Sequence, residues 1–272
     1  MNDLKISIIG ASGRMGSTII EESKNFKDII IKHLIEHKGH KIIGSTIDGL
    51  RVTDDLEGCI EESDVLIDFS SPISTLNIMK KLSNKDSPAL VIGTTGFSVD
   101  QEKEFDELRN GLKVLRASNM SVGVNIMFNI THYLTKILPD ETNIEILDVH
   151  HKSKKDAPSG TSLSLGEEVK DGKSLEKNFR FEFRGSTQNS QRKENEIGFS
   201  SIRGGDVIGD HSVFFFLDGE RIEIIHRASS RNIYAKGALA AARWINNKKQ
   251  GLYNMKDLVK VKQGEENVDS QE

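Results

Sequence analysis

A short apolar segment near the start of the chain leads directly into a loop of evenly spaced glycines. The segment Leu4–Ile9 is rich in β-branched residues, a pattern typical of a strand that is buried on both faces. Gly10, Gly13 and Gly16 follow, and a helical pattern begins within this loop. Glycines here permit a tight turn, close approach of a pyrophosphate to the backbone, and close packing of helix on sheet. The unit therefore predicts a dinucleotide-binding fold.

Strand and helix patterns alternate through the first part of the chain. This rhythm predicts an α/β fold with a Rossmann-type, doubly wound parallel sheet and helices on both of its faces. The further strands expected are Ile29–Ile35, Asp64–Phe69, Ala89–Ile92 and Lys113–Ala117, and the expected helices are Arg14–Lys24, Ile73–Leu82 and Gln101–Arg109.

The rhythm changes after Ser121. Segments there alternate apolar and polar residues, which is typical of strands with one solvated or helix-covered face. We therefore expect a smaller α+β domain with a mixed or antiparallel sheet, including a hairpin that turns at Asp218 and Gly219. The expected strands are Ile144–Val149, Arg180–Phe183, Phe214–Leu217 and Arg221–Ile225, with a helix Val124–Leu138 before them and a helix Ile233–Trp244 after them.

The composition excludes several classes of protein. Hydrophobic residues make up 36% and charged residues 29% of the 272 positions, as in ordinary globular proteins. A formal net charge of −4, with no long basic stripe, argues against a nucleic-acid partner. Apolar runs are too short for a membrane span. Cys59 is the only cysteine, which favours a reducing, cytoplasmic location.

The segment His150–Thr161 contains two histidines, three lysines and a Pro-Ser-Gly-Thr turn, at the junction of a strand pattern and a helix pattern. The helix start offers the free N–H groups of Gly160 and Thr161 to an anion. A histidine suits proton donation because its ordinary pKa, about 6.5, lies near the operating pH. These groups predict a site that holds and protonates a small, doubly anionic substrate. We expect no metal site here, because the lysines repel cations.

Glu36 ends the second expected strand, where a carboxylate can accept hydrogen bonds from both ribose hydroxyls of a dinucleotide. It would repel the 2′-phosphate of NADPH, so we expect NADH to be favoured. The basic residues that follow, His37, Lys38 and Lys41, could attract that phosphate instead. Use of NADPH as well as NADH therefore stays open.

Several motifs resemble those of one family, the 4-hydroxy-tetrahydrodipicolinate reductases (dihydrodipicolinate reductases) of the diaminopimelate–lysine pathway. They follow the family's order and spacing over almost the whole chain, and the histidine-lysine block is the most specific of them. The matching segments are Gly10–Gly16 (GASGRMG), Asp68–Ser70 (DFS), Gly93–Phe97 (GTTGF), Ser118–Asn125 (SNMSVGVN), His150–Thr161 (HHKSKKDAPSGT), Arg203–Asp206 (RGGD) and Ala228–Arg231 (ASSR).

The resemblance implies NAD(P)H-dependent reduction of a cyclic imine that carries two carboxylates. In that reaction 4-hydroxy-tetrahydrodipicolinate is converted, through dihydrodipicolinate, to tetrahydrodipicolinate. The family also implies a dinucleotide-binding domain from residues 1–121 and 232–272, and a substrate-binding and oligomerisation domain from residues 122–231. Its members are expected to form homotetramers.

By position, the resemblance implies roles for individual residues. His150 corresponds to the catalytic acid and Lys154 to a second proton donor. The expected substrate-binding residues are His151, Ser159, Gly160 and Thr161. The expected cofactor-binding residues are Gly10, Ala11, Ser12, Gly13, Arg14, Met15, Glu36, Gly93, Thr94, Thr95, Ala117, Ser118, Asn119 and Met120. Ser71 and His37 stand where relatives carry arginines, which weakens the case for NADPH, and Met120 replaces a frequent phenylalanine.

Two alternatives stay open. A nucleotide-sensing binding protein would keep the glycine loop, but it would not need a histidine-lysine pair beside a helix start. Another NAD(P)-dependent dehydrogenase, acting on amino acids or semialdehydes, is the closer rival. Competition by a planar pyridine dicarboxylate would separate that rival from a reductase of this family.

Overall fold

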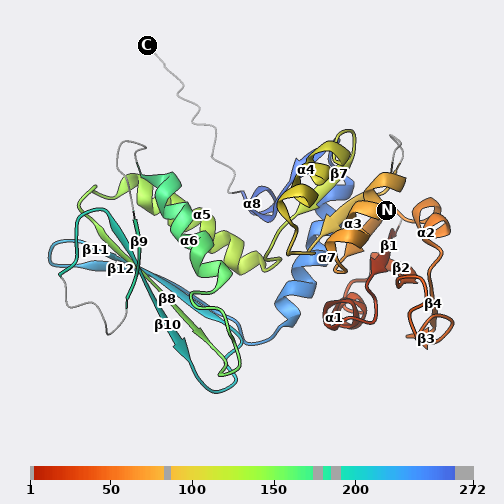
Figure 1. The fold of residues 1–272 in the computed structure, drawn as a ribbon, viewed down its shortest axis with the longest axis horizontal. Helices are drawn as coiled ribbons and strands as arrows, with labels where there is room; N and C mark the ends of the chain where they lie inside the picture. The colour runs from red at the N-terminus through yellow and green to blue at the C-terminus, as the bar shows by residue number, and fades with distance from the viewer. Residues whose placement is uncertain (1–2, 83–86, 174–179, 185–190, 261–272) are drawn as a thin grey trace, which may run out of the picture.

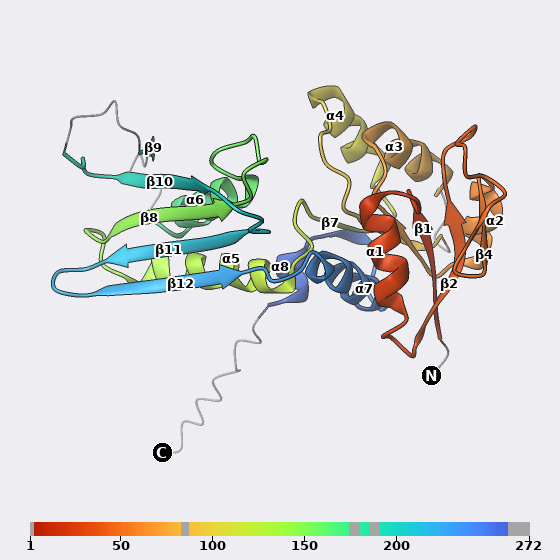
Figure 2. The ribbon, with the colours of Figure 1, turned by 90° about the horizontal axis from the view of Figure 1, so that it is seen from below.

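The computed structural model describes residues 3–82, 87–173, 180–184 and 191–260 of the chain (Figure 1). Figures 1 and 2 show two bodies of secondary structure, each built around its own sheet. The acidic segment 263–272, which the sequence analysis places at the end of the dinucleotide-binding domain, lies outside the described residues. Within the described ranges, no helix combines the length and the apolar character needed to cross a bilayer.

The first body contains the predicted α/β sheet. Its strands pair in parallel, except for the antiparallel pair at one edge. Across the sheet the order is β13 (Gly251–Tyr253), β7 (Lys113–Arg116), β6 (Ala89–Ile92), β5 (Val65–Asp68), β1 (Leu4–Ile9), β2 (Ile29–Ile35), β4 (Leu50–Thr53) and β3 (Thr46–Ile47). The strand order reverses at β1, and in open parallel sheets ligands bind beyond the carboxyl ends of the strands at such a point.

Helices cover both faces of this sheet, as predicted. On one face α1 (Arg14–Ser23) and α7 (Asn232–Asn246) contribute to one buried apolar cluster. On the other, α2 (Leu56–Glu62), α3 (Pro72–Lys81) and α4 (Val99–Leu108) contribute to a second. Helix α7 comes from the far end of the chain and packs on α1 and on β5, β6 and β7. The chain thus returns to the first body at α7.

The second body contains a mixed sheet, also as predicted. Strands β8, β9 and β10 pair in parallel, β11 pairs antiparallel with β8, and β12 pairs antiparallel with β11. The order is β12 (Arg221–Arg227), β11 (Asp210–Phe216), β8 (Asn143–His150), β10 (Glu196–Arg203) and β9 (Arg180–Phe183). At the hairpin, the Leu217 N–H donates to the Glu220 carbonyl at 2.9 Å, and Gly219 has a φ of +79°.

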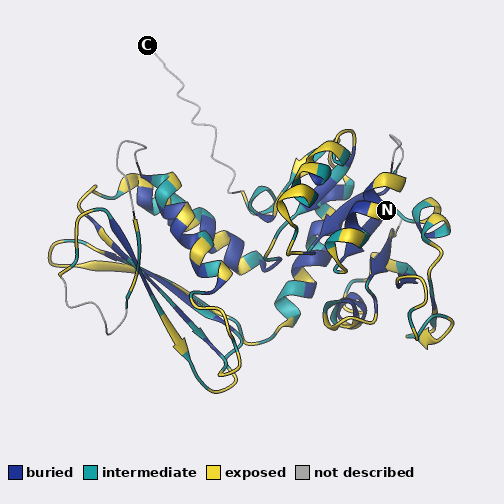
Figure 3. Ribbon diagram, viewed as in Figure 1, coloured by how far each residue is buried: buried dark blue, intermediate teal, exposed yellow. Residues whose placement is uncertain are grey.

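Helices α5 (Val122–Ile137) and α6 (Gly160–Gly172) cover one face of this mixed sheet. In Figure 3 the buried side of each helix is turned towards the strands, and exposed residues lie on its outer side. The Ser121 side chain caps α5 by accepting from the Val124 N–H. The short helix α8 (Met255–Leu258) follows β13 and contacts α5.

Strand β10 was not predicted from the sequence. Gly198 and two serines interrupt its alternation of apolar and polar residues, which hides the strand signal. A Cβ at Gly198 would overlap the carboxylate of Glu145 on the neighbouring strand, so the glycine leaves room for that side chain. The short elements β3, β4, β13, α2 and α8 were also not predicted.

Candidate active site

The glycine loop between β1 and α1 forms part of the wall of a cavity of about 570 Å³. Gly10 has a φ of +76°, a conformation that glycine adopts without the steric cost of a side chain. Gly13 is the N-cap of α1 and has no side chain, so the first N–H groups of the helix have no capping side chain as hydrogen-bond partner. Such groups attract phosphate. The predicted residues Gly10, Ser12, Gly13 and Glu36 line this cavity, as a dinucleotide site requires.

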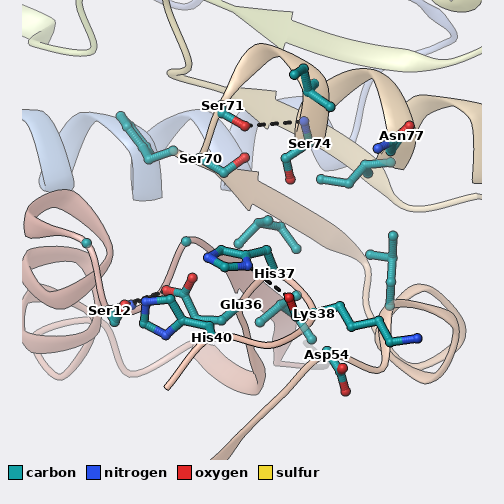
Figure 4. A pocket seen from close by; sticks show the side chains of 18 residues that line it. Ser12, Glu36, His37, Lys38, His40, Asp54, Ser70, Ser71, Ser74 and Asn77 are labelled. Atoms are coloured by element: carbon teal, nitrogen blue, oxygen red, sulfur yellow. Dashed lines mark hydrogen bonds between the residues drawn. The ribbon is translucent and has the colours of Figure 1, made fainter. Parts of the chain in front are cut away.

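The carboxylate of Glu36 lies at the end of β2, beside the glycine loop. Its Oε1 accepts hydrogen bonds from the N–H and the Oγ of Ser12, both at 2.7 Å (Figure 4). The residue is only 8% exposed. Ser12 therefore holds a buried carboxylate in place at the position where the sequence analysis expects the ribose hydroxyls.

The two sides of this cavity differ in charge (Figure 4). One side, at the start of α3, carries small neutral polar groups, and Ser71 Oγ there accepts from the Ser74 N–H at 3.4 Å. The other side, after β2, carries basic side chains together with the carboxylates of Glu36 and Asp54. The neutral residues are Ser70, Ser71, Ser74 and Asn77, and the basic residues are His37, Lys38 and His40.

A buried carboxylate ties together the loops that follow β5 and β6. Asp68 accepts from the Ser70 N–H at 3.0 Å, from Ser70 Oγ at 2.5 Å and from the Thr75 hydroxyl. The Ser70 N–H also reaches Thr94 Oγ1 at 3.1 Å. Burial raises the pKa of Asp68, and these hydrogen bonds oppose that shift. Asp68 thus connects the predicted cofactor loop at Thr94 to the start of α3.

A second cavity, of about 480 Å³, is lined by residues of both bodies. The Asn119 side chain donates to Thr161 Oγ1 at 3.1 Å and joins the two bodies at this place. Predicted cofactor residues and predicted substrate residues therefore border one space. From the first body the cavity wall includes Thr95, Ser118 and Asn119, and from the second His150, His151, Lys154, Ser159, Gly160 and Thr161.

Strand β8 ends at His150, and His151 is the first residue of the loop that follows. Both histidines can therefore reach the same cavity, which the sequence analysis required. Nδ1 of His150 lies 2.8 Å from Oδ2 of Asp148, and the residue is 7% exposed. Burial lowers the pKa of His150 below its ordinary value, and the hydrogen bond to Asp148 opposes that effect.

The start of α6 lies at the same cavity. Ser159 is the N-cap, and its Oγ accepts from the Ser162 N–H at 3.2 Å. Gly160 and Thr161 form the first turn, where helix N–H groups lack intrahelical partners. The Lys154 ammonium pairs with Asp156 at 2.8 Å. An imidazole, a cation and a helix start together can hold an anion and deliver a proton to it.

Several predicted cofactor residues do not line either of these two cavities. Ala11 and Met120 are buried in the apolar cluster beneath α7, and Met15 and Ala117 pack against that cluster. Gly93 lies against the ring of Phe69, where a larger residue would clash. Thr94 is tied to the Asp68 network, and Arg14 is exposed at the start of α1. The buried residues among them support the cofactor loops by packing.

Comparisons with known proteins match the chain along nearly its whole length. The sequence model "Dihydrodipicolinate reductase, N-terminus" matches residues 4–120, and "Dihydrodipicolinate reductase, C-terminus" matches residues 123–259. The chain belongs to the dihydrodipicolinate reductase family. Enzymes of this family are NAD(P)H-dependent oxidoreductases, and the chain is one of them.

Individual members of the dihydrodipicolinate reductase family agree with this. The 4-hydroxy-tetrahydrodipicolinate reductase of Hahella chejuensis (strain KCTC 2396) is 41% identical over 268 residues, 95% of this chain and 99% of that protein. The one of Geotalea uraniireducens (strain Rf4) is 38% identical over 265 residues, 94% and 98% of the two chains. The dipicolinate-bound dihydrodipicolinate reductase of Paenisporosarcina sp. TG-14 has the same fold, with a TM-score of 0.75, 20% identity and coverage of 93% and 97%.

One residue of the dihydrodipicolinate reductase cavity was missed by sequence reasoning. His211 is not among the site residues expected from the sequence, but it lines the cavity. Its Nε2 lies 3.0 Å from Ser159 Oγ, and its ring meets that of His150 edge-on at 5.1 Å between centroids. Burial lowers the pKa of His211 to about 4, so it is neutral near pH 7. The only local signal is a polar residue at a buried position of an alternating strand.

Proposed function

We propose that this enzyme reduces dihydrodipicolinate, formed from 4-hydroxy-tetrahydrodipicolinate by loss of water, to tetrahydrodipicolinate in diaminopimelate and lysine biosynthesis. The family membership and the names of its relatives support this reaction. The observation that carries the proposal is the shared cavity, which Asn119 of the cofactor loops borders together with His150 and Gly160. A cytoplasmic location belongs to the same proposal, and the single, buried Cys59 accords with a reducing compartment.

The chain's own groups account for the proton and the charge. Bound NAD(P)H supplies a hydride, which adds to the ring carbon conjugated with the imine. The resulting enamine takes up a proton, for which His150 is the donor we propose. Lys154 lines the same cavity as His150 and is the second cation proposed to lie near the substrate ring. It assists proton transfer or stabilises the developing charge.

Two carboxylates of the substrate need two anchors. We assign one to the N–H groups of Gly160 and Thr161 at the start of α6, together with the Thr161 hydroxyl and the N-cap residue Ser159. The other is assigned to His151 and a lysine of the same loop. The relative from Paenisporosarcina was solved with dipicolinate, a planar dicarboxylate, which supports an anchor of this kind.

The remaining cofactor-loop residues (Gly10–Met15, Gly93–Thr95 and Ala117–Met120) are proposed to shape or contact the nucleotide. We place the domain boundaries at residues 121 and 232, because every strand of the first sheet comes from residues 4–116 or 251–253.

The second domain is proposed to form a homotetramer. Its helix-free sheet face supports this, since the exposed apolar residues Ile202, Phe216 and Ile225 lie there by register.

Reduction of the precursor tests the proposed function directly. We expect the absorbance of NADH to fall when 4-hydroxy-tetrahydrodipicolinate is supplied, and dipicolinate to inhibit competitively. A sensor without catalysis would bind NADH with no loss of absorbance. A dehydrogenase of another class would oxidise NADH only with a different amino acid or semialdehyde and would ignore dipicolinate.

NADH is expected to bind more tightly than NADPH. The reason is that a 2′-phosphate would meet the buried carboxylate of Glu36, while His37 and Lys38 offset part of that repulsion. Parallel titrations with both cofactors measure the ratio. Glu36→Gln should reduce the preference for NADH, measured as the ratio of the two dissociation constants, by about tenfold, equivalent to ~1.4 kcal/mol. Glu62→Gln, which removes an exposed carboxylate from the end of α2, is the matched control and should leave the ratio unchanged.

A further inference from the structure

The carboxylate of Asp148 is surrounded by hydrogen-bond donors from several elements. Its Oδ2 lies 2.8 Å from His150 Nδ1 and accepts from Arg203 Nη1 at 2.7 Å. Its Oδ1 accepts from Ser201 Oγ at 2.6 Å and from the Ser159 N–H at 3.3 Å. Asp148 is fully buried. An ionised carboxylate only accepts hydrogen bonds, so four donors around it hold it in one orientation.

We propose that Asp148 is a positioning residue that fixes the ring and the tautomer of His150, so that Nε2 is the nitrogen that delivers the proton. This inference rests on the proposed function, in which His150 is the acid. It adds a carboxylate–imidazole pair, held by Arg203, to the machinery of the site.

The sheet register explains how this pair is assembled. Asp148 and His150 lie two residues apart on β8, so both side chains point to the helix-covered face. On β10, Ser201 is paired with Asp148 and Arg203 with His150. On the other side, β11 pairs His211 with Asp148. The acid is therefore enclosed by both neighbouring strands, and its ring cannot turn freely.

The space beside Nε2 is kept open by a glycine. A Cβ on Gly209 would lie 3.0 Å from Nε2 of His150 and 3.3 Å from its Cδ2. Because Nδ1 is held by Asp148, Nε2 is the nitrogen left for the substrate. When Nε2 gives up its proton, the neutral ring keeps the other proton on Nδ1, which donates a hydrogen bond to the carboxylate of Asp148. The same logic orients the imidazole in hydrolytic Ser-His-Asp triads.

The charged neighbours of His150 act in opposite directions. Burial lowers its pKa, Asp148 on the same strand raises it, and Lys154 in the following loop and Arg203 on β10 lower it. His211 on β11 is neutral near pH 7 and adds no charge. Asp148 itself stays ionised: burial alone would raise its pKa, but hydrogen bonds from Ser201, Arg203 and His150 hold it below its ordinary value. Asp148 is thus the group that keeps a buried imidazole able to take up a proton.

Asp148 also links the acid to the anion site. Asp148 accepts a hydrogen bond from the N–H of Ser159, which is the N-cap of α6. The substrate carboxylate is proposed to bind at this helix start. One carboxylate therefore sets the distance between the proton donor and the anchor of the substrate. Small errors in such a distance strongly reduce rates.

Opposite pH shifts in two variants test the inference. An acid is active below its pKa, so kcat/KM falls as pH rises through the pKa of His150. Asp148→Asn should lower kcat/KM about 10²-fold or more at neutral pH and move this fall to lower pH by about 1–3 units. Arg203→Met should move the fall in kcat/KM to higher pH. Glu145→Gln, which neutralises another arginine-paired carboxylate on β8, should leave the pH of this fall unchanged.

Nitrogen NMR of histidine-labelled, unmodified protein supplies a readout that needs neither folding of a variant nor turnover. Above its pKa, His150 is expected as the Nδ1–H tautomer. The inference is overturned by an Nε2–H tautomer, by an unshifted pH profile in Asp148→Asn, or by shifts of the same sign in both variants. If the unmodified protein fails to oxidise NADH with the precursor, the proposed function fails instead, and the tautomer still tests the positioning by Asp148.

Discussion

Replacement of His150 by Gln is expected to lower kcat by about 10²-fold or more, because the site loses its proposed proton donor. Glutamine fills similar space but cannot give up a proton at operating pH. NADH affinity should change little, since His150 does not line the cavity that is formed by the glycine loop and Glu36. Stopped-flow turnover and NADH fluorescence titration measure the two quantities.

His33→Gln is the matched control for this substitution. His33 lies on β2 and pairs with Glu62, outside both cavities described above, so turnover should be unaffected. A His150→Gln variant with near-normal turnover would remove His150 from the proposed role.

The pH profile of the unmodified enzyme carries a related expectation. Burial lowers the pKa of His150, so kcat/KM, which reports the free enzyme, should fall as pH rises through a value below the ordinary one. A bound dicarboxylate favours the imidazolium. The fall in kcat, which reports the complex, should therefore occur at higher pH than the fall in kcat/KM.

Replacement of Gly16 by Ala is expected to disrupt the glycine loop. A Cβ there would overlap the carbonyl oxygen of Gly10 and lie 2.6 Å from that of Ala11. Both obstacles are backbone atoms, so the loop or α1 must move, at a cost of about 1–3 kcal/mol or more. Because this loop is the proposed phosphate site, NADH affinity should fall by about tenfold per 1.4 kcal/mol of misfit.

Thermal unfolding and NADH titration of Gly16→Ala measure the two effects. Gly204→Ala is the matched control, because a Cβ at Gly204 meets no atom within 4 Å. An alanine variant at Gly16 with unchanged stability and unchanged NADH binding would contradict the close packing of loop and helix.

Much of the fold was predictable because its signals are local. Strands β1, β2 and β6 begin and end at the predicted residues, since each is rich in apolar residues and is followed directly by glycine or a charged residue. The hairpin at Gly219 was predicted because its turn needs a positive φ. Strand β10 was not predicted. The glycine within it, Gly198, makes room for the side chain of Glu145 on β8, and the sequence does not show that these residues are neighbours.

The candidate site divides in the same way. The histidine block and the helix start at Gly160 lie close together in sequence, so their chemistry was predictable. Arg203 and His211 lie more than fifty residues beyond Asp148 in the chain, and they come to lie beside it only through the pairing of β10 and β11 with β8. The RGGD motif contains Arg203, but no local pattern marks either residue as a neighbour of Asp148.

The sequence by itself determined the dinucleotide-binding unit, the change from parallel to mixed sheet, and the acid-and-anion-site block. In each case neighbours along the chain carry the signal through backbone conformation, side-chain periodicity or helix ends. Only the tertiary structure decided which strands flank β8 and that Asp148 accepts hydrogen bonds from three segments of the chain. The reason is register: a shift of one residue in β10 or β11 would turn Arg203 or His211 to the opposite face of the sheet.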